Sequence, residues 1–197
     1  MIRRRGISMV ATAVLLSVVC VSAASASTSA TAVLKSEALS IAQMPKGWTA
    51  QQPTYNLRMG CLSQLLEPKG VTRTHLVEVH YQGKGDVPQL IETLTTYNNT
   101  PLAYRKIAAA SASCKRVSGT LKGYPVTGTV RTLALARQGN ESVAYLIAMA
   151  GQHLRFQADY VIARKGNVVV TVIEGNVPTV NLTQFRNFVS TAVARVK

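Results

Sequence analysis

The chain has 197 residues, a formal net charge of +14 and 47% hydrophobic residues. This composition excludes an intrinsically disordered protein, and the length suits one domain with its own hydrophobic core. Lysine and arginine outnumber acidic residues by 22 to 8, which favours acidic partners over basic ones.

The first 26 residues have the pattern of a secretory signal peptide. Arginines at positions 3–5 precede an apolar run over residues 7–21, and the small residues Ala-Ser-Ala end at Ala26, where we expect cleavage. The apolar run is shorter than the roughly 20 residues that a helix needs to cross a bilayer. Two alternatives to cleavage at Ala26 stay open. One is that the segment is retained as a membrane anchor. The other is that a lipid is attached at Cys20, although Val19 stands where a lipoprotein signal has a small residue.

Cleavage would leave 171 residues (197 minus 26), a net charge of +11 (19 basic minus 8 acidic) and two cysteines, Cys61 and Cys114. An even pair in an oxidising compartment predicts a disulfide. It would close a loop of about 54 residues and stabilise the fold by roughly 4 kcal/mol. The alternative is a pair of buried free thiols. The sequence therefore predicts a basic protein that is secreted or associated with the cell envelope.

The first segments after the cleavage site predict little regular structure. Residues 27–35 are rich in serine, threonine and alanine, which is typical of a flexible leader. Ser36 is suited to cap a short helix over residues 37–43, and Pro45 ends it. Residues 49–72 are expected to be mostly loop.

The middle of the chain predicts a strand, an ambiguous segment and a helix. Alternation over residues 74–82 indicates a strand with His75 and His80 on opposite faces. Residues 89–97 either pair with this strand or form a helix. A helix begins at Asn99-Thr100-Pro101 and continues to about residue 115, with Cys114 pointing inward.

The rest of the chain predicts a β-meander and a final helix. In the first strand of this meander the alternation of apolar and polar residues shifts by one position midway, which indicates a bulge. The last strand is a β-branched run that we expect to be covered on both faces. Asn181 caps the helix Leu182–Val196. The predicted fold class is α+β, a twisted antiparallel sheet flanked by helices in a single domain over residues 36–197. The strands are expected at residues 121–136, 141–150, 153–164 and 168–173.

No pattern in the chain marks an enzyme. The three histidines lack the spacing of zinc ligands, so neither a metal nor a cofactor is expected. No serine stands in a Gly-x-Ser-x-Gly sequence, and we predict no catalytic residue. The alternative is a secreted hydrolase whose triad, for example a serine with His153 and Asp159, is assembled only by the fold.

The basic residues are dispersed along the predicted strands and helices. A shared face of them would attract an anionic cell-wall polymer or lipid headgroups. Nucleic acid is not expected as a partner, because no aromatic residues are interleaved with the basic ones. The alternative is a solvated exterior that has a basic bias and no specific partner.

Three stretches resemble the PknH-type extracellular sensor domain of actinobacteria, which also occurs in small exported lipoproteins. They are Leu39–Thr49 with its Pro-Lys-Gly-Trp, the segment Tyr104–Cys114, and Val168–Ile173 with the helix that follows. The resemblance covers about residues 36–197 and implies an antiparallel sheet flanked by helices, with a cleft for an unknown ligand. Family members often carry four cysteines and are attached to a kinase or a lipid, whereas the cleaved chain would have two cysteines and has no kinase domain.

Together these features favour an exported, non-catalytic, sensor-like domain that binds a ligand at the bacterial cell surface. The expected ligand is a small apolar or amphiphilic molecule in a partly apolar pocket. Trp48 is the candidate ligand-binding residue, and the alternative is that it serves as a packing anchor.

Overall fold

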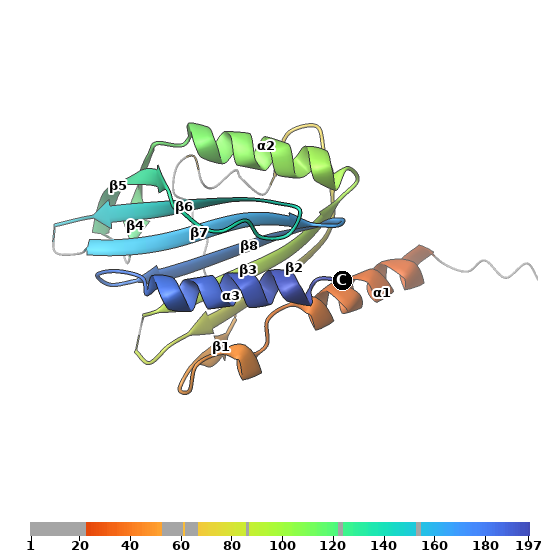
Figure 1. The fold of residues 1–197 in the computed structure, drawn as a ribbon, viewed down its shortest axis with the longest axis horizontal. Helices are drawn as coiled ribbons and strands as arrows, with labels where there is room; N and C mark the ends of the chain where they lie inside the picture. The colour runs from red at the N-terminus through yellow and green to blue at the C-terminus, as the bar shows by residue number, and fades with distance from the viewer. Residues whose placement is uncertain (1–22, 53–60, 62–66, 86, 122–123, 153–154) are drawn as a thin grey trace, which may run out of the picture.

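The structure is a computed structural model that describes residues 23–52, 61, 67–85, 87–121, 124–152 and 155–197. In this part of the chain, eight antiparallel strands form one open sheet of order β1-β2-β3-β8-β7-β6-β5-β4, and three α-helices flank it (Figure 1). The predicted α+β class is confirmed. Most of the expected signal segment, including Cys20, lies outside the described residues.

The elements follow one another in this order: α1 (Ala23–Glu37), a 3-10 turn η1 (Ile41–Gln43), β1 (Thr49–Gln51), β2 (Arg73–Gln82), β3 (Gln89–Tyr97), α2 (Thr100–Ser113), β4 (Arg116–Leu121), β5 (Tyr124–Thr132), β6 (Glu141–Ala150), β7 (Arg155–Lys165), β8 (Val168–Asn176) and α3 (Leu182–Arg195).

The sheet is built from two antiparallel groups that meet at β3 and β8. The hairpin β2–β3 forms one side, and α2 then carries the chain to the far edge, from which β4 to β8 return as a meander. The last strand, β8, pairs with both β3 and β7 and is therefore central. Its run of valines is buried on both faces, as the sequence predicted.

Each face of the sheet carries its own hydrophobic core (Figure 1). On the α3 side, α1 and α3 pack on β2, β3, β8 and β7, with Leu90, Val172 and Phe185 fully buried. On the α2 side, Ile107 of α2 and Ile162 of β7 are fully buried. This two-sided packing fixes the strand register, because a slip of one residue would exchange the two sets of side chains.

Asparagine side chains begin two of the helices as predicted. The Oδ1 of Asn99 accepts a hydrogen bond from the N–H of Leu102 at the start of α2, and Asn181 accepts bonds from the first turn of α3. At the other end of α3, the guanidinium of Arg195 donates to the carbonyls of Ser36, Glu37 and Ala38. It thereby holds the negative end of α1 against the C-terminal helix.

The N-terminal segment differs from the expectation. Residues 27–35, expected as a flexible leader, lie within α1. The short helix expected over residues 37–43 is replaced by the end of α1 and the turn η1, which Ser40 begins. The reason is tertiary packing, because Leu34 is buried in the α3-side core and Arg195 holds the helix end.

The strand expected over residues 121–136 is also wrong in its bounds. The sheet pairs β4 with β5, and β5 ends at Thr132. The shift of apolar phase is not a bulge. Val126 and Val130 face the α2 side, whereas Leu133 lies beyond the strand and packs on the α3-side core. The ambiguous segment 89–97 is a strand, β3, paired with β2 along its whole length.

Candidate functional site

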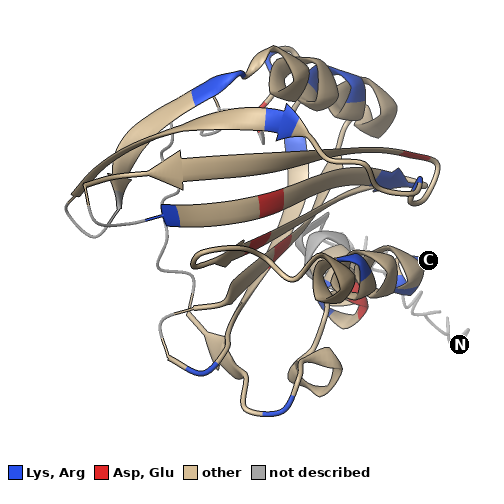
Figure 2. Cartoon of the chain, turned by 60° about the vertical axis from the view of Figure 1, so that its left-hand side comes forward, with Lys and Arg blue, Asp and Glu red and all other residues tan. Residues whose placement is uncertain are grey.

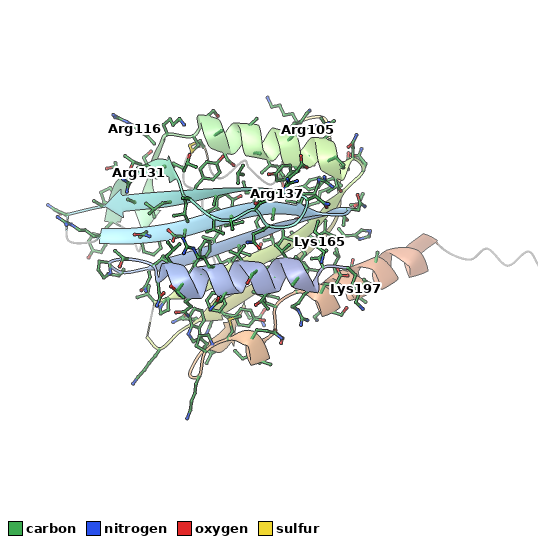
Figure 3. The ribbon with its side chains drawn as sticks, in the orientation of Figure 1. Arg105, Arg116, Arg131, Arg137, Lys165 and Lys197 are labelled. Atoms are coloured by element: carbon green, nitrogen blue, oxygen red, sulfur yellow. A yellow bond between two sulfur atoms is a disulfide. The ribbon has the colours of Figure 1, made fainter. Side chains whose placement is uncertain are left out.

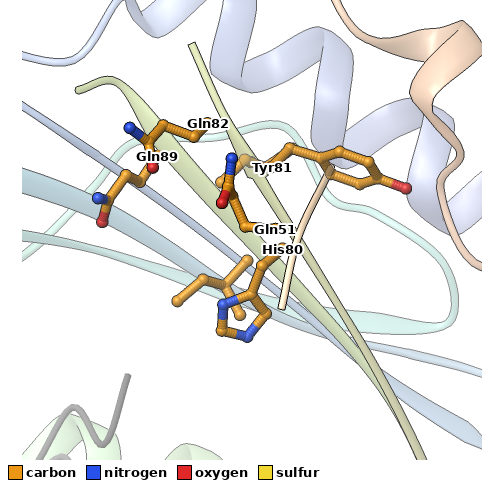
Figure 4. A pocket seen from close by; sticks show the side chains of 7 residues that line it. Gln51, His80, Tyr81, Gln82 and Gln89 are labelled. Carbon is orange, nitrogen blue, oxygen red and sulfur yellow. The ribbon is translucent and has the colours of Figure 1, made fainter. Parts of the chain in front are cut away.

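A small polar pocket lies at the β1 edge of the sheet, on its α2 side (Figure 4). Its cavity volume is about 70 Å³, which admits a few water-sized groups. Register brings the polar lining together, because Gln51 pairs with His80 across β1 and β2, and Gln82 pairs with Gln89 across β2 and β3. The remaining lining comes from Tyr81, Leu90 and Ile91.

The pocket presents amides and an imidazole and no lysine or arginine. The amide nitrogen of Gln51 donates to the Thr49 hydroxyl at 2.8 Å, and that of Gln82 donates to the Gly85 carbonyl. The amide oxygen of each side chain can still accept a hydrogen bond. Tyr81 points the other way in Figure 4, and its hydroxyl donates to the Leu39 carbonyl at 2.7 Å.

His80 is the most constrained side chain of the pocket. It is 5% exposed, and its Nε2 lies 2.5 Å from Oε1 of Glu78, which is 30% exposed. One ring nitrogen is therefore committed to the carboxylate, which orients the ring. His75 lies on the opposite face, as predicted, where its Nδ1 is 3.2 Å from the Thr31 hydroxyl of α1.

A second unusual feature is a pair of buried carboxylates beneath α3. Asp159 of β7 and Glu174 of β8 are cross-strand partners on the α3 side, and each is 1% exposed. Both Oε atoms of Glu174 and the Oδ2 of Asp159 accept no hydrogen bond from the described residues, while Gln157 donates to the Oδ1 of Asp159 at 2.8 Å. Burial and then the Asp159 charge raise the pKa of Glu174 to about 8.

Glu92 is a third carboxylate on the same face, in β3. Its Oε2 accepts the backbone N–H of Leu39 at 2.6 Å, so it fastens the segment that follows α1 to the sheet. Burial raises its pKa to about 7, against the lowering effects of that hydrogen bond and of Arg195. Its position could have been predicted, because alternation places Glu92 on the same face as Leu90 and Leu94.

The cysteines are joined as predicted. Cys61 and Cys114 form a disulfide with a Cα–Cα distance of 5.8 Å, and Cys114 is buried at the C-terminal end of α2. The bond therefore ties the segment around residue 61 to the helix on the α2 side. Neither cysteine lines the pocket.

Trp48, the ligand-binding candidate from the sequence, lies half-buried on the α3 side. Its ring packs edge to face on Phe188 of α3, with centroids 5.5 Å apart. It is not among the residues that line the pocket. A ligand-binding role for Trp48 stays a prediction.

The hydrolase alternative stays a hypothesis. His153 lies outside the described residues, and Asp159 is buried beside Gln157 and Glu174. Among the residues that are described, no group of three or more His, Cys, Asp or Glu side chains is placed to hold a metal ion.

Sequence reasoning did not find the pocket glutamines. Gln51 belongs to a three-residue strand that is too short to show a period, and Gln82 and Gln89 end and begin their strands. Only the pairing of β1 with β2 brings them to one place.

An open antiparallel sheet with one helix on one face and two on the other defines a small α+β domain. The chain is similar in structure to the extracellular domain of PknH from Mycobacterium tuberculosis, with a TM-score of 0.59, 12% identity, and coverage of 82% of this chain and 93% of that one. The sequence resemblance is thus confirmed at the level of the fold.

A second similar structure is an uncharacterized protein from Mycobacterium smegmatis, with a TM-score of 0.49, 14% identity, and coverage of 84% and 95% of the two chains. No family model and no curated protein matches the sequence. In the described part of the chain, no helix has both the length and the apolar character needed to cross a membrane. The disulfide between Cys61 and Cys114 is typical of proteins that fold in an oxidising compartment.

Proposed function

We propose that the chain is an extracellular, sensor-like binding domain whose ligand places a neutral, hydrogen-bonding group in the pocket between β1, β2 and β3. Two observations support this role. The fold is that of an extracellular domain, and the pocket collects three amide side chains and an oriented imidazole at one edge of the sheet.

The residues that line the pocket indicate which class of ligand would bind. Charged ligands would lack a counter-charge, because no lysine or arginine lines the pocket and the carboxylate of Glu78 is engaged by His80. Hydroxyl and amide groups instead match the amides of Gln51 and Gln82, which accept and donate hydrogen bonds at the same site. Ile91, which pairs with His80 and lies on the same face, adds an apolar surface.

The sequence led us to expect a small apolar or amphiphilic ligand, and the pocket restricts which part of such a ligand could enter. An amphiphilic molecule would enter with its polar end, since the small volume admits one functional group and not a whole apolar body. Sugars with hydroxyl and acetamido groups, and capped peptides, have the required chemistry. The domain would bind and not transform its ligand.

The test measures binding of two probes, N-acetylglucosamine and N-acetylalanine amide, by two-dimensional NMR of the purified protein. We expect millimolar probe to shift the side-chain signals of Gln51 and His80 first. The side-chain amide signal of Gln82 should shift as well, and a Gln51→Ala and His80→Asn double variant should lose this Gln82 shift, while Gln152→Ala, at an exposed position between β6 and β7, should keep it. Shifts confined to other regions, or none with either probe, would overturn the proposal.

A further inference from the structure

One face of the sheet carries basic side chains without a helix over them. On the α3 side, α3 packs on β7 and β8, and the outer strands β4 and β5 extend beyond it (Figure 1). Along β5 the side chains alternate, so that Val126 and Val130 are buried toward α2, whereas Thr127, Thr129 and Arg131 are exposed toward the α3 side. The exposed residues of β4, β5 and the start of β7 on this side are called the outer sheet face, and the segment 133–140 lies over the neighbouring part of β6 and β7.

The strand register places three arginines on the outer sheet face. Arg116 of β4 pairs with Thr129. Arg131, two residues further along β5, is therefore on the same face as Arg116. Arg131 pairs with Leu146 of β6, and Arg155 of β7 pairs with Ala150 of β6. Leu146 and Ala150 are four residues apart on one strand and share a face, so Arg155 lies on the same face as Arg131. All three arginines are exposed.

Strand geometry gives the spacing of these arginines. Neighbouring strands lie about 4.8 Å apart and residues rise about 3.4 Å along a strand, so the Cα atoms of Arg116 and Arg131 are about 8 Å apart, and that of Arg155 is about 16 Å from each. Figure 3 shows Arg116 and Arg131 near each other at the β4–β5 end of the molecule. One compact anion cannot reach all three, whereas a chain of anionic groups can.

No salt bridge between described residues includes Arg116, Arg131 or Arg155, and Asp159, which lies two strands from Arg131 on the same face, is buried. Among the described residues, the salt bridges of carboxylates are with Arg73, His80 and Arg164. The other described acidic side chains are buried, which hides them from the surface: Glu37, Glu92, Asp159 and Glu174. Figure 2 shows acidic segments mainly within the strands and near α3, and basic segments at strand ends, turns and helices.

Hydroxyl groups fill the space between the arginines. Ser118 pairs with Thr127 across β4 and β5, and both lie exposed on the outer sheet face with Thr129. Such hydroxyls donate to and accept from polyol and sugar hydroxyls as well as phosphate oxygens. The face thus combines guanidinium groups, which bind phosphate through paired N–H donors, with hydrogen-bonding groups for the links between phosphates.

We infer that the outer sheet face, formed by Arg116, Ser118, Thr127, Thr129, Arg131 and Arg155, binds a linear polyol or sugar polymer with phosphodiester links. Nucleic acid would lack an aromatic side chain on which to stack, because the exposed Tyr124 is two residues from Val126 on β5 and therefore faces the α2 side. A bilayer lacks an apolar anchor, because the large exposed apolar residues of the described chain lie elsewhere, at Val33, Ile41, Tyr124 and Val177.

The test measures binding of purified poly(glycerol phosphate) at several salt concentrations. The variant R116Q/R131Q/R155Q removes the three arginines, and K46Q/K84Q/R186Q removes equal charge from exposed sites in two turns and α3. We expect the first variant to lose at least tenfold in affinity and to lower the slope of log K against log salt by about 2 to 3. The second variant should lose less than threefold.

Two results would overturn the inference. Equal losses in both variants would mean that only net charge matters, and tighter binding to phosphatidylglycerol vesicles or to single-stranded DNA than to the polymer would assign the face to another partner. The substitutions lie on the surface, where effects on stability are within about 0.5 kcal/mol, so thermal unfolding provides the check on folding. Failure here leaves the pocket proposal untouched, because none of these residues lines the pocket.

Discussion

Replacement of Glu174 by glutamine should remove a loss of stability that develops as the pH rises from 4.5 to about 8. Glu174 is 1% exposed and faces Asp159 across β7 and β8, and neither Oε atom has a hydrogen-bond donor in the described chain. The folded protein therefore favours the protonated carboxyl, whereas the unfolded chain ionises freely in water. Glutamine keeps the shape of the side chain and cannot ionise.

The size and direction of the effect follow from the pKa. Burial and the Asp159 charge raise the pKa of Glu174 from 4.5 to about 8. Below pH 4 the group is protonated in both states and its titration does not alter stability. Between these pKa values only the unfolded state loses the proton, so each pH unit lowers the free energy of unfolding by about 1.4 kcal/mol. The loss reaches about 5 kcal/mol above pH 8 and then stays constant.

The assay is urea unfolding of the purified protein between pH 4 and pH 9, followed by Trp48 fluorescence. The stability of E174Q relative to the wild type should rise by about 2–5 kcal/mol from pH 4 to pH 8.5, because any cost of the amide itself does not depend on pH. E67Q is the control, since that side chain is 76% exposed in its salt bridge with Arg73. Parallel curves for the wild type and E174Q over the whole range would refute the reasoning.

Two further substitutions test the framework of the sheet. Replacing Cys61 and Cys114 by serine should lower the free energy of unfolding by roughly 4 kcal/mol, because the disulfide closes a loop with a sequence separation of 53, and the same urea titration without reductant measures it. Gly128→Ala should cost about 1–3 kcal/mol, because its Cβ would lie 2.3 Å from the carbonyl oxygen of Ala148 on the paired strand β6, and thermal unfolding beside the exposed Thr129→Ala should show the difference.

Local patterns were sufficient to predict much of the sheet. Alternation in residues 74–82 gave β2 with its two faces, and the β-branched run at Val168–Ile173 indicated a strand buried on both sides. Asn99 and Asn181 marked the starts of α2 and α3. These features depend on neighbours in the sequence, so the sequence displays them directly.

Contacts between distant segments account for what could not be predicted. The helix α1 is rich in serine and threonine, which favour helices weakly, and it is held by Leu34 in the core and by Arg195 from the other end of the chain. The pocket depends on the pairing of β1, a strand of three residues, with β2. The facing of Asp159 and Glu174 likewise follows from a register that only the folded sheet fixes.

The two proposed binding surfaces lie on opposite faces and toward opposite edges of one sheet. The pocket opens on the α2 side beside β1, whereas the outer sheet face lies on the α3 side, on β4, β5 and the start of β7. With β3 and β8 between them and both cores packed on those strands, neither ligand would obstruct the other. Asp159 lies on the same face as Arg131, two strands away, but burial raises its pKa and that of Glu174, which disfavours negative charge beside the arginines. A domain held to an anionic polymer by one face would therefore keep its pocket open to a neutral ligand on the other.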